Sequence, residues 1–115
     1  MRWFRRIVED YEARLAPPGP SAVRQSARGK AEHERFEDGE IQLEVRIRGL
    51  EFANGTEVEI RLNGAIVSRT GVTRGVMSLR LSNHKGDTIP TVRAGDRLEV
   101  VHRGVVVLTG SFLPD

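Results

Sequence analysis

The sequence predicts an all-β protein, an antiparallel sandwich of about seven strands that follows an amphipathic helix at the N-terminus. Apolar and charged residues alternate from Ile41 onward, as in the segment IQLEVRIR, so each such strand has one apolar and one charged face. Turn residues, chiefly Gly, Asn and Asp, separate these segments at intervals of about ten residues. Because a sheet with one apolar face must bury it, packing a second sheet against it is the simplest solution.

The length and composition of the chain favour one small domain in the cytoplasm. A chain of 115 residues can bury one modest core. It has no cysteine, which excludes disulfides and cysteine-ligated zinc. No stretch has the ~18 apolar residues of a membrane-spanning helix, and no signal peptide is visible.

Residues 1–16 are expected to form the amphipathic helix. At about 100° per residue, six apolar side chains fall within an arc of about 140°, and most of the charged residues fall opposite them. Pro17 and Pro18 are expected to end the helix, because proline lacks an N–H group and disfavours helical geometry in the preceding residue. The apolar stripe consists of Trp3, Phe4, Ile7, Val8, Tyr11 and Leu15.

A flexible linker over residues 17–27, rich in Pro, Gly and Ser, is expected to join the helix to a sandwich domain at residues 28–115. Asn63-Gly64 is the strongest hairpin signal, and residues 83–96 form the longest loop. A small, partly open barrel is the main alternative to the sandwich. The strands are expected at residues 28–36, 40–49, 56–62, 65–70, 75–82, 97–102 and 105–112.

The sandwich region resembles a known group of domains over roughly residues 29–112. It has a G-x-A start, a strand like L-x-V-x-V-x-G-L, a hairpin like V-N-G and a closing L-x-G-x-F strand. In these features it is similar to small bacterial immunoglobulin-like β-sandwich domains of the CHRD type. The resemblance implies an immunoglobulin-like fold and a non-catalytic role. The chain has no H-x-H pair, so the resemblance carries no metal site with it.

No pattern in the sequence predicts an active site, a cofactor or a metal centre. The spacing of His33, His84 and His102 matches no set of metal ligands. No serine lies in a G-x-S-x-G motif, and no glycine-rich loop precedes a helix. Paired carboxylates next to arginines are expected to form solvated cross-strand ion pairs. These pairs are Glu32 with Glu34 and Glu57 with Glu59.

The first functional hypothesis is a non-enzymatic structural or protein-interaction module. The apolar stripe of the helix must be covered by something, so it is expected to bind a protein partner or a second copy of the chain, giving a homo-oligomer. A small-ligand or glycan site in the 83–96 loop is a weaker alternative, because that loop carries no aromatic side chain.

The second hypothesis is a peripheral binder of an anionic membrane or of nucleic acid. Residues 1–30 carry seven basic and three acidic groups, a net charge of +4, whereas residues 31–115 carry eleven basic and thirteen acidic groups, a net charge of −2. A basic arm on a mildly acidic body favours an anionic partner for the arm. The candidate anion-binding residues are Arg2, Arg5, Arg6, Arg24 and Arg28.

Overall fold

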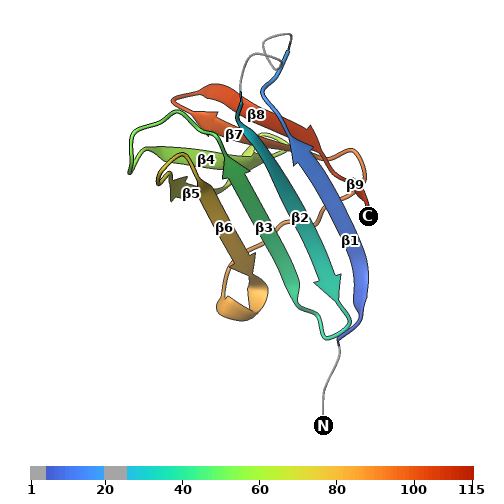
Figure 1. Ribbon diagram of the computed structural model, residues 1–115. Helices are drawn as coiled ribbons and strands as arrows, with labels where there is room; N and C mark the ends of the chain where they lie inside the picture. The colour runs from blue at the N-terminus through green and yellow to red at the C-terminus, as the bar shows by residue number, and fades with distance from the viewer. Residues whose placement is uncertain (1–4, 20–25) are drawn as a thin grey trace.

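The alternating segments form two antiparallel sheets in the computed structural model, which describes residues 5–19 and 26–115. The sheets lie one over the other with their apolar faces inward (Figure 1). The five-stranded sheet has the order β6-β3-β2-β1-β9, and the four-stranded sheet has the order β5-β4-β7-β8. The elements are β1 (Ile7–Leu15), β2 (Arg28–Phe36), β3 (Ile41–Arg48), β4 (Glu57–Leu62), β5 (Ala65–Gly71), β6 (Met77–Ser82), the short 3₁₀ helix η2 (Asn83–Lys85), β7 (Arg97–His102), β8 (Val105–Ser111) and β9 (Leu113–Pro114).

The prediction of an N-terminal helix is wrong, because Ile7–Leu15 form a strand. Strand β1 pairs with β2 along its length, from Ile7 opposite Phe36 to Leu15 opposite Gly29. The apolar residues that suggested a helix recur every four residues, and a spacing of four keeps side chains on one side of a helix and also on one face of a strand. Pairing with β2 then adds backbone hydrogen bonds and core burial, which outweigh local helical preference.

The seven strands predicted after residue 27 are present as β2 to β8, with ends within two residues of the predicted ones. The predicted hairpin at Asn63-Gly64 is confirmed, with φ angles of 49° and 86°, and Arg103-Gly104 turns the chain in the same way, with φ angles of 49° and 77°. Positive φ at both central residues is the geometry of a type I′ turn, which matches the twist of paired strands. Most of the predicted linker, residues 20–25, lies outside the described residues.

The core lies between the sheets, and β1 closes one side of it. Ala16 and Thr109 exchange backbone hydrogen bonds of 3.1 and 2.9 Å, which link the end of β1 to β8 of the other sheet. Gly110 allows this approach, because a Cβ atom there would lie 2.0 Å from the Arg14 carbonyl oxygen. The largest fully buried side chains are those of Phe112, Leu15, Leu43, Ile47, Ile60, Met77, Leu98 and Leu108.

None of the described residues belongs to a helix with the length and apolar character that crossing a membrane requires.

Candidate functional site

The outer face of the five-stranded sheet is organised in rows that run across the strands. Ala13, Ala31 and Val45 pair with one another across β1, β2 and β3 and are fully buried, so the residues on either side of them point outward. On one side of this row, Arg14 pairs with Lys30, and Lys30 with Arg46. The antiparallel register therefore brings cations from three strands together.

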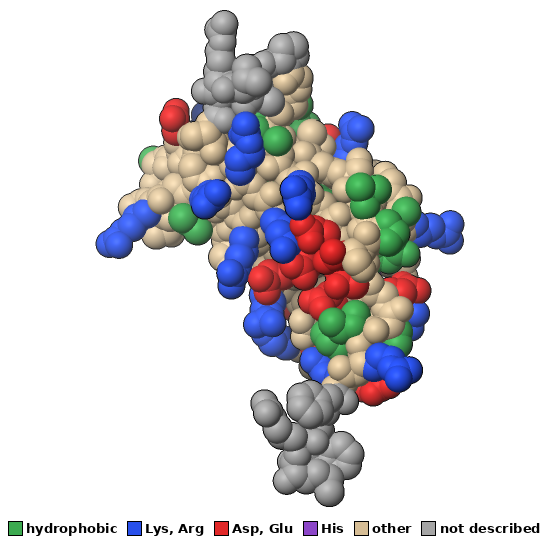
Figure 2. Space-filling view, turned by 45° about the vertical axis from the view of Figure 1, so that its right-hand side comes forward, with side chains coloured by type: hydrophobic (Ala, Val, Ile, Leu, Met, Phe, Trp, Pro, Cys, Tyr) green, Lys and Arg blue, Asp and Glu red, His purple; other side chains and the backbone are tan. Residues whose placement is uncertain are grey.

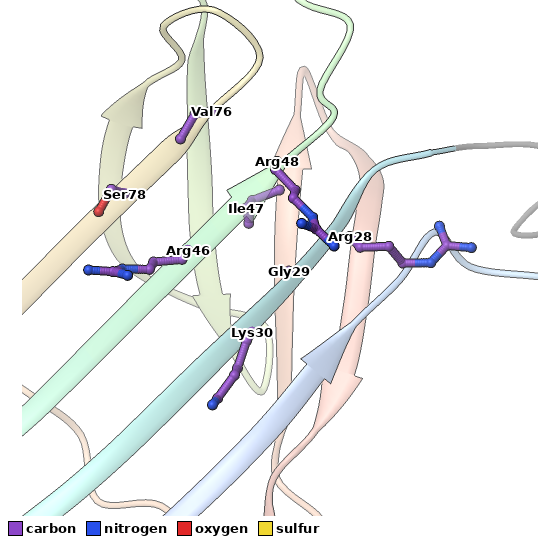
Figure 3. Close-up of a pocket in the computed structure, with 8 residues that line it drawn as sticks. All are labelled: Arg28, Gly29, Lys30, Arg46, Ile47, Arg48, Val76 and Ser78. Atoms are coloured by element: carbon purple, nitrogen blue, oxygen red, sulfur yellow. The ribbon is translucent and has the colours of Figure 1, made fainter.

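Two adjoining depressions lie at this end of the face, with volumes of about 610 and 580 Å³. In the next row outward Arg28 pairs with Arg48, so the cations form two neighbouring rows (Figure 3). Gly29 lies between them, where a Cβ atom would come within 2.7 Å of the Arg46 carbonyl oxygen, so β2 and β3 pack closely beneath the larger depression. We call five residues the basic end: Arg14, Arg28, Lys30, Arg46 and Arg48.

Carboxylates occupy the rows on the other side of Ala31. Glu12 pairs with Glu32, and Glu32 with Glu44. Asp10 and Glu34 pair in the following row. In Figure 2 acidic side chains form one cluster on this face, with Lys and Arg side chains beside and above them. We call these five carboxylates the acidic end.

Ion pairs connect the two ends where they meet. The Lys30 Nζ atom lies 2.9 Å from Glu32 and 3.6 Å from Glu12, and the Arg46 Nε atom lies 3.2 Å from Glu44. Arg80 on β6 is a second cation beside Glu44, at 3.5 Å. Exposed pairs of this kind contribute about 0–1 kcal/mol each, so they align the side chains more than they stabilise the fold.

The outermost carboxylates, those of Asp10 and Glu34, lie among other carboxylates. Burial raises the pKa of Asp10 and of Glu34, and the surrounding carboxylates raise both further. The Asp10 Oδ1 atom is buried and has no hydrogen-bond partner in the described part of the chain. One carboxylate oxygen each of Asp10, Glu32 and Glu34 lies within 4.8 Å of the others, a spacing that a hard cation such as Ca²⁺ or Mg²⁺ could bridge.

The structure divides the predicted apolar stripe. Ile7 and Val8 are 44% and 41% exposed, whereas Leu15 is 1% exposed and Tyr11 packs against the core. Leu15 therefore stabilises the sandwich and is not free to bind a partner, which corrects the prediction for this residue. Trp3 and Phe4 lie outside the described residues.

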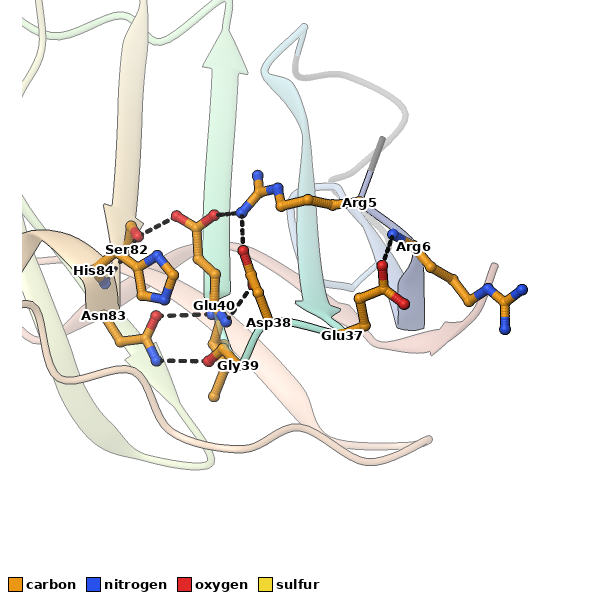
Figure 4. A network of polar contacts seen from close by, with 10 residues as sticks. Arg5, Arg6, Glu37, Asp38, Gly39, Glu40, Ser82, Asn83 and His84 are labelled. Atoms are coloured by element: carbon orange, nitrogen blue, oxygen red, sulfur yellow. Dashed lines mark hydrogen bonds and ion pairs between the residues drawn. The ribbon is translucent and has the colours of Figure 1, made fainter. Parts of the chain in front are cut away.

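The predicted anion-binding arginines for which the structure gives a position, Arg5, Arg6 and Arg28, do not form one cluster. Of the three that the structure describes, Arg28 alone lies at the basic end; Arg2 and Arg24 lie outside the described residues. Arg5 and Arg6 lie at the opposite end of β2, beside the β2–β3 turn (Figure 4).

Arg5 belongs to a structural network at that turn. Its guanidinium pairs with Glu40 and, at 3.2 Å, with Asp38, and it stacks on the Phe36 ring at 4.1 Å. The Ser82 hydroxyl donates a hydrogen bond to the other Glu40 oxygen. Donation by Ser82 and by Arg5 lowers the pKa of Glu40 to about 2, so this buried carboxylate stays ionised.

The histidines make separate contacts and do not form one shared site. The Nε2 atom of buried His33 lies 2.9 Å from the Pro90 carbonyl oxygen, and this contact holds the 83–96 loop against β2. Burial lowers the pKa of His33. The ring of His102 lies 4.5 Å from that of Phe52. Among the described residues no histidine joins a cluster that could hold a metal ion.

The predicted cross-strand ion pairing is present at Glu59, which lies 3.3 Å from Arg69 on the neighbouring strand β5. Glu59 also lies 2.8 Å from Arg61 on its own strand. The charged rows of the five-stranded sheet, in contrast, were missed. The available signal was a pair of opposite charges two residues apart on three successive strands, Glu12-x-Arg14, Lys30-x-Glu32 and Glu44-x-Arg46. Only the register shows that like charges align.

No protein-family model matches the chain, and a search of the curated proteins finds no match either.

Proposed function

We propose that this protein is a non-enzymatic module that binds a nucleic acid. The phosphate backbone of the nucleic acid would lie across the basic end. The observation that carries the proposal is that five cations from three adjacent strands line two adjoining depressions, the second of which Glu12 also lines. Phosphate contacts of this kind give affinity without reading sequence. The immunoglobulin-like fold implied by the resemblance stays a prediction, and would suit such a role.

The shape of the basic end favours a narrow ligand. Neighbouring strands lie about 4.8 Å apart and alternate residues about 7 Å apart, so three strands and two rows span roughly 10 by 7 Å. A single phosphodiester backbone is narrow enough to lie along these rows and place its phosphates beside the cations.

The acidic end argues against a membrane as the ligand. A broad anionic surface laid on this face would meet the carboxylates of Glu12, Glu32 and Glu44 as well as the cations. A single polyanion strand can follow the basic rows and avoid the acidic ones. No aromatic side chain lines either depression in the described part of the chain, so base stacking is not part of the proposed contact.

The test is fluorescence anisotropy with labelled DNA duplexes of about 20 base pairs in two unrelated sequences. Affinity should be equal for the two sequences and should fall steeply between about 50 and 200 mM salt. The variant Arg28→Ala/Arg48→Ala should weaken binding to both and reduce the slope of log affinity against log salt by about 2, because each lost contact removes about 0.9.

The matched control is Arg93→Ala/Arg97→Ala, which removes the same charge from exposed positions outside the basic end. It should change the affinity and the salt slope little. Equal losses in the two variants, or the absence of DNA binding at low salt, would contradict the proposal. Binding to vesicles rich in anionic lipid without binding to DNA would favour a membrane ligand instead.

A further inference from the structure

The charges on the outer face of the five-stranded sheet are antisymmetric about the buried row Ala13–Ala31–Val45. On each of the three strands, the outward residue on one side of this row is a cation and the outward residue on the other side is a glutamate. The three opposed pairs are Arg14 with Glu12, Lys30 with Glu32, and Arg46 with Glu44. One row further out, Arg28 lies on the basic side and Glu34 on the acidic side, each three residues from Ala31.

This pattern is self-complementary under one simple rotation. A half-turn about an axis that lies in the interface along the row Ala13–Ala31–Val45 places a second copy face to face with the first and reverses its strand direction. Each strand then lies over its own copy. Lys30 of either copy faces Glu32 of the other, and Arg28 of either copy faces Glu34 of the other. Every such contact occurs twice, as an isologous interface requires.

We propose that two copies of this chain associate through these faces as a two-fold dimer, with the basic end of each on the acidic end of the other. The partner is a second copy because four cations and four carboxylates of this face occupy mirrored positions, so its own charge pattern is largely the complement that it needs. The two remaining charged residues face uncharged ones, Arg48 facing Gln42 and Asp10 facing Ala16. A partner with a broad anionic surface would be repelled by the acidic end.

The state of the outermost carboxylates supports this arrangement. Asp10 and Glu34 are half-buried and lie beside other carboxylates, which raises the pKa of both. Dimerisation would bring Arg28 of the other copy to Glu34 and relieve part of this repulsion. Because the contacts are charged and solvated, the dimer should be weak and sensitive to salt.

The experiment is sedimentation equilibrium of the full chain over a range of concentrations, at low salt (about 10 mM) and at high salt (about 1 M), where the Debye length falls from about 30 to 3 Å. The wild-type protein should be a dimer at low salt and a monomer at high salt. The variant Lys30→Glu/Arg46→Glu makes the central rows acidic, and the variant Glu32→Lys/Glu44→Lys makes them basic. Each variant alone should be monomeric, and an equimolar mixture should restore the dimer mass.

The matched control is Glu51→Lys/Glu57→Lys, which reverses two exposed charges away from this face and should leave the wild-type dimer intact. Circular dichroism verifies that every variant is folded. A wild-type monomer at low salt overturns the proposal, and so does a mixture of folded variants that stays monomeric. Dimerisation of either variant alone also overturns it, because the interface would then lie elsewhere.

This inference does not depend on nucleic-acid binding, because it needs the acidic end as well as the basic end. The basic variant should bind DNA more tightly than the wild-type protein even though it cannot form a homodimer. If dimerisation fails, DNA binding by the wild-type protein can still hold, and the reverse is also true. The two measurements therefore separate the two proposals.

Discussion

At the scale of single residues, Glu40 shows how one ionised side chain fastens the end of the sheet away from the basic end. It follows the β2–β3 turn, is 7% exposed, and accepts hydrogen bonds from Ser82 at the end of β6 and from Arg5 before β1. Three segments that are distant in the sequence thus meet at one carboxylate. A buried charge is tolerated only where such donors compensate for lost hydration.

The pH dependence of stability follows from this network. Because the folded-state pKa of Glu40 is about 2 against an ordinary value of 4.5, its ionised form favours folding above pH 4.5, and this contribution is lost as the pH falls through about 2. The variant Glu40→Gln should therefore melt at a lower temperature than the wild-type protein near neutral pH, and the difference should shrink in acid. Thermal melting of the two proteins, followed by circular dichroism at neutral pH and in acid, measures the difference in melting temperature.

Glu51→Gln is the control for Glu40→Gln, because it removes a carboxylate of the same kind from an exposed position. It should leave the melting temperature nearly unchanged. A Glu40→Gln variant that melts like the wild-type protein at every pH would show that the carboxylate charge does not stabilise the fold.

At the scale of elements, β1 is where interpretation from sequence fails, and the reason is geometric. Tyr11 and Leu15 are four residues apart, a spacing that places them together on a helix and also on a strand. The outcome depends on β2, which offers a partner along the whole of β1. Hairpins such as Asn63-Gly64 were predictable because their signal is local. The pairing of β1 with β2 across the chain from residue 16 to residue 27 is not local, and neither is the contact of β1 with β8.

The contact between β1 and β8 can be tested at Gly110. A Cβ atom there would lie 2.0 Å from the Arg14 carbonyl oxygen and 2.9 Å from the Arg14 carbonyl carbon, both backbone atoms that cannot rotate away. The variant Gly110→Ala should lower the free energy of unfolding by about 1–3 kcal/mol or more, because the two sheets must move apart along this edge. Urea denaturation followed by circular dichroism gives the value.

Gly71→Ala is the matched control for Gly110→Ala. Gly71 is the last residue of β5, and its φ angle is not positive, so alanine can adopt the same backbone conformation. A Cβ atom there would have no neighbour within 4 Å. Its substitution should change the free energy of unfolding little. If both variants are equally stable, β1 and β8 are not held together as closely as Gly110 indicates.

At the scale of the whole molecule, the sequence was sufficient to predict two packed sheets but not which surface carries function. The charged doublets on β1, β2 and β3 were visible in the sequence, but the predicted ion pairs concerned only Glu32 with Glu34 and Glu57 with Glu59. Their collective property appears only when the strands are placed in register, because β2 runs opposite to β1 and β3 and its doublet has the opposite order. Lys30-x-Glu32 lies between Glu12-x-Arg14 and Glu44-x-Arg46, and the reversal aligns cation with cation.

The two proposals for this face predict a competition at the level of the whole molecule. The basic end would be covered by the acidic end of the second copy in the dimer, so only the monomer could offer it to DNA. Adding duplex DNA at low salt should therefore convert dimers into complexes that contain one protein chain for each binding site. The apparent affinity for DNA should fall as the dimer fraction rises, in proportion to the fraction of competent monomer.

Sedimentation velocity with labelled DNA at several protein concentrations measures this competition, and the variant Glu32→Lys/Glu44→Lys supplies its control. That variant is expected to be monomeric, so its affinity for DNA should not depend on protein concentration. If the wild-type affinity is equally independent of concentration while dimers are present, DNA and the second copy do not share the basic end. The dimer interface or the DNA site would then have to lie on another surface, such as the exposed side of the four-stranded sheet.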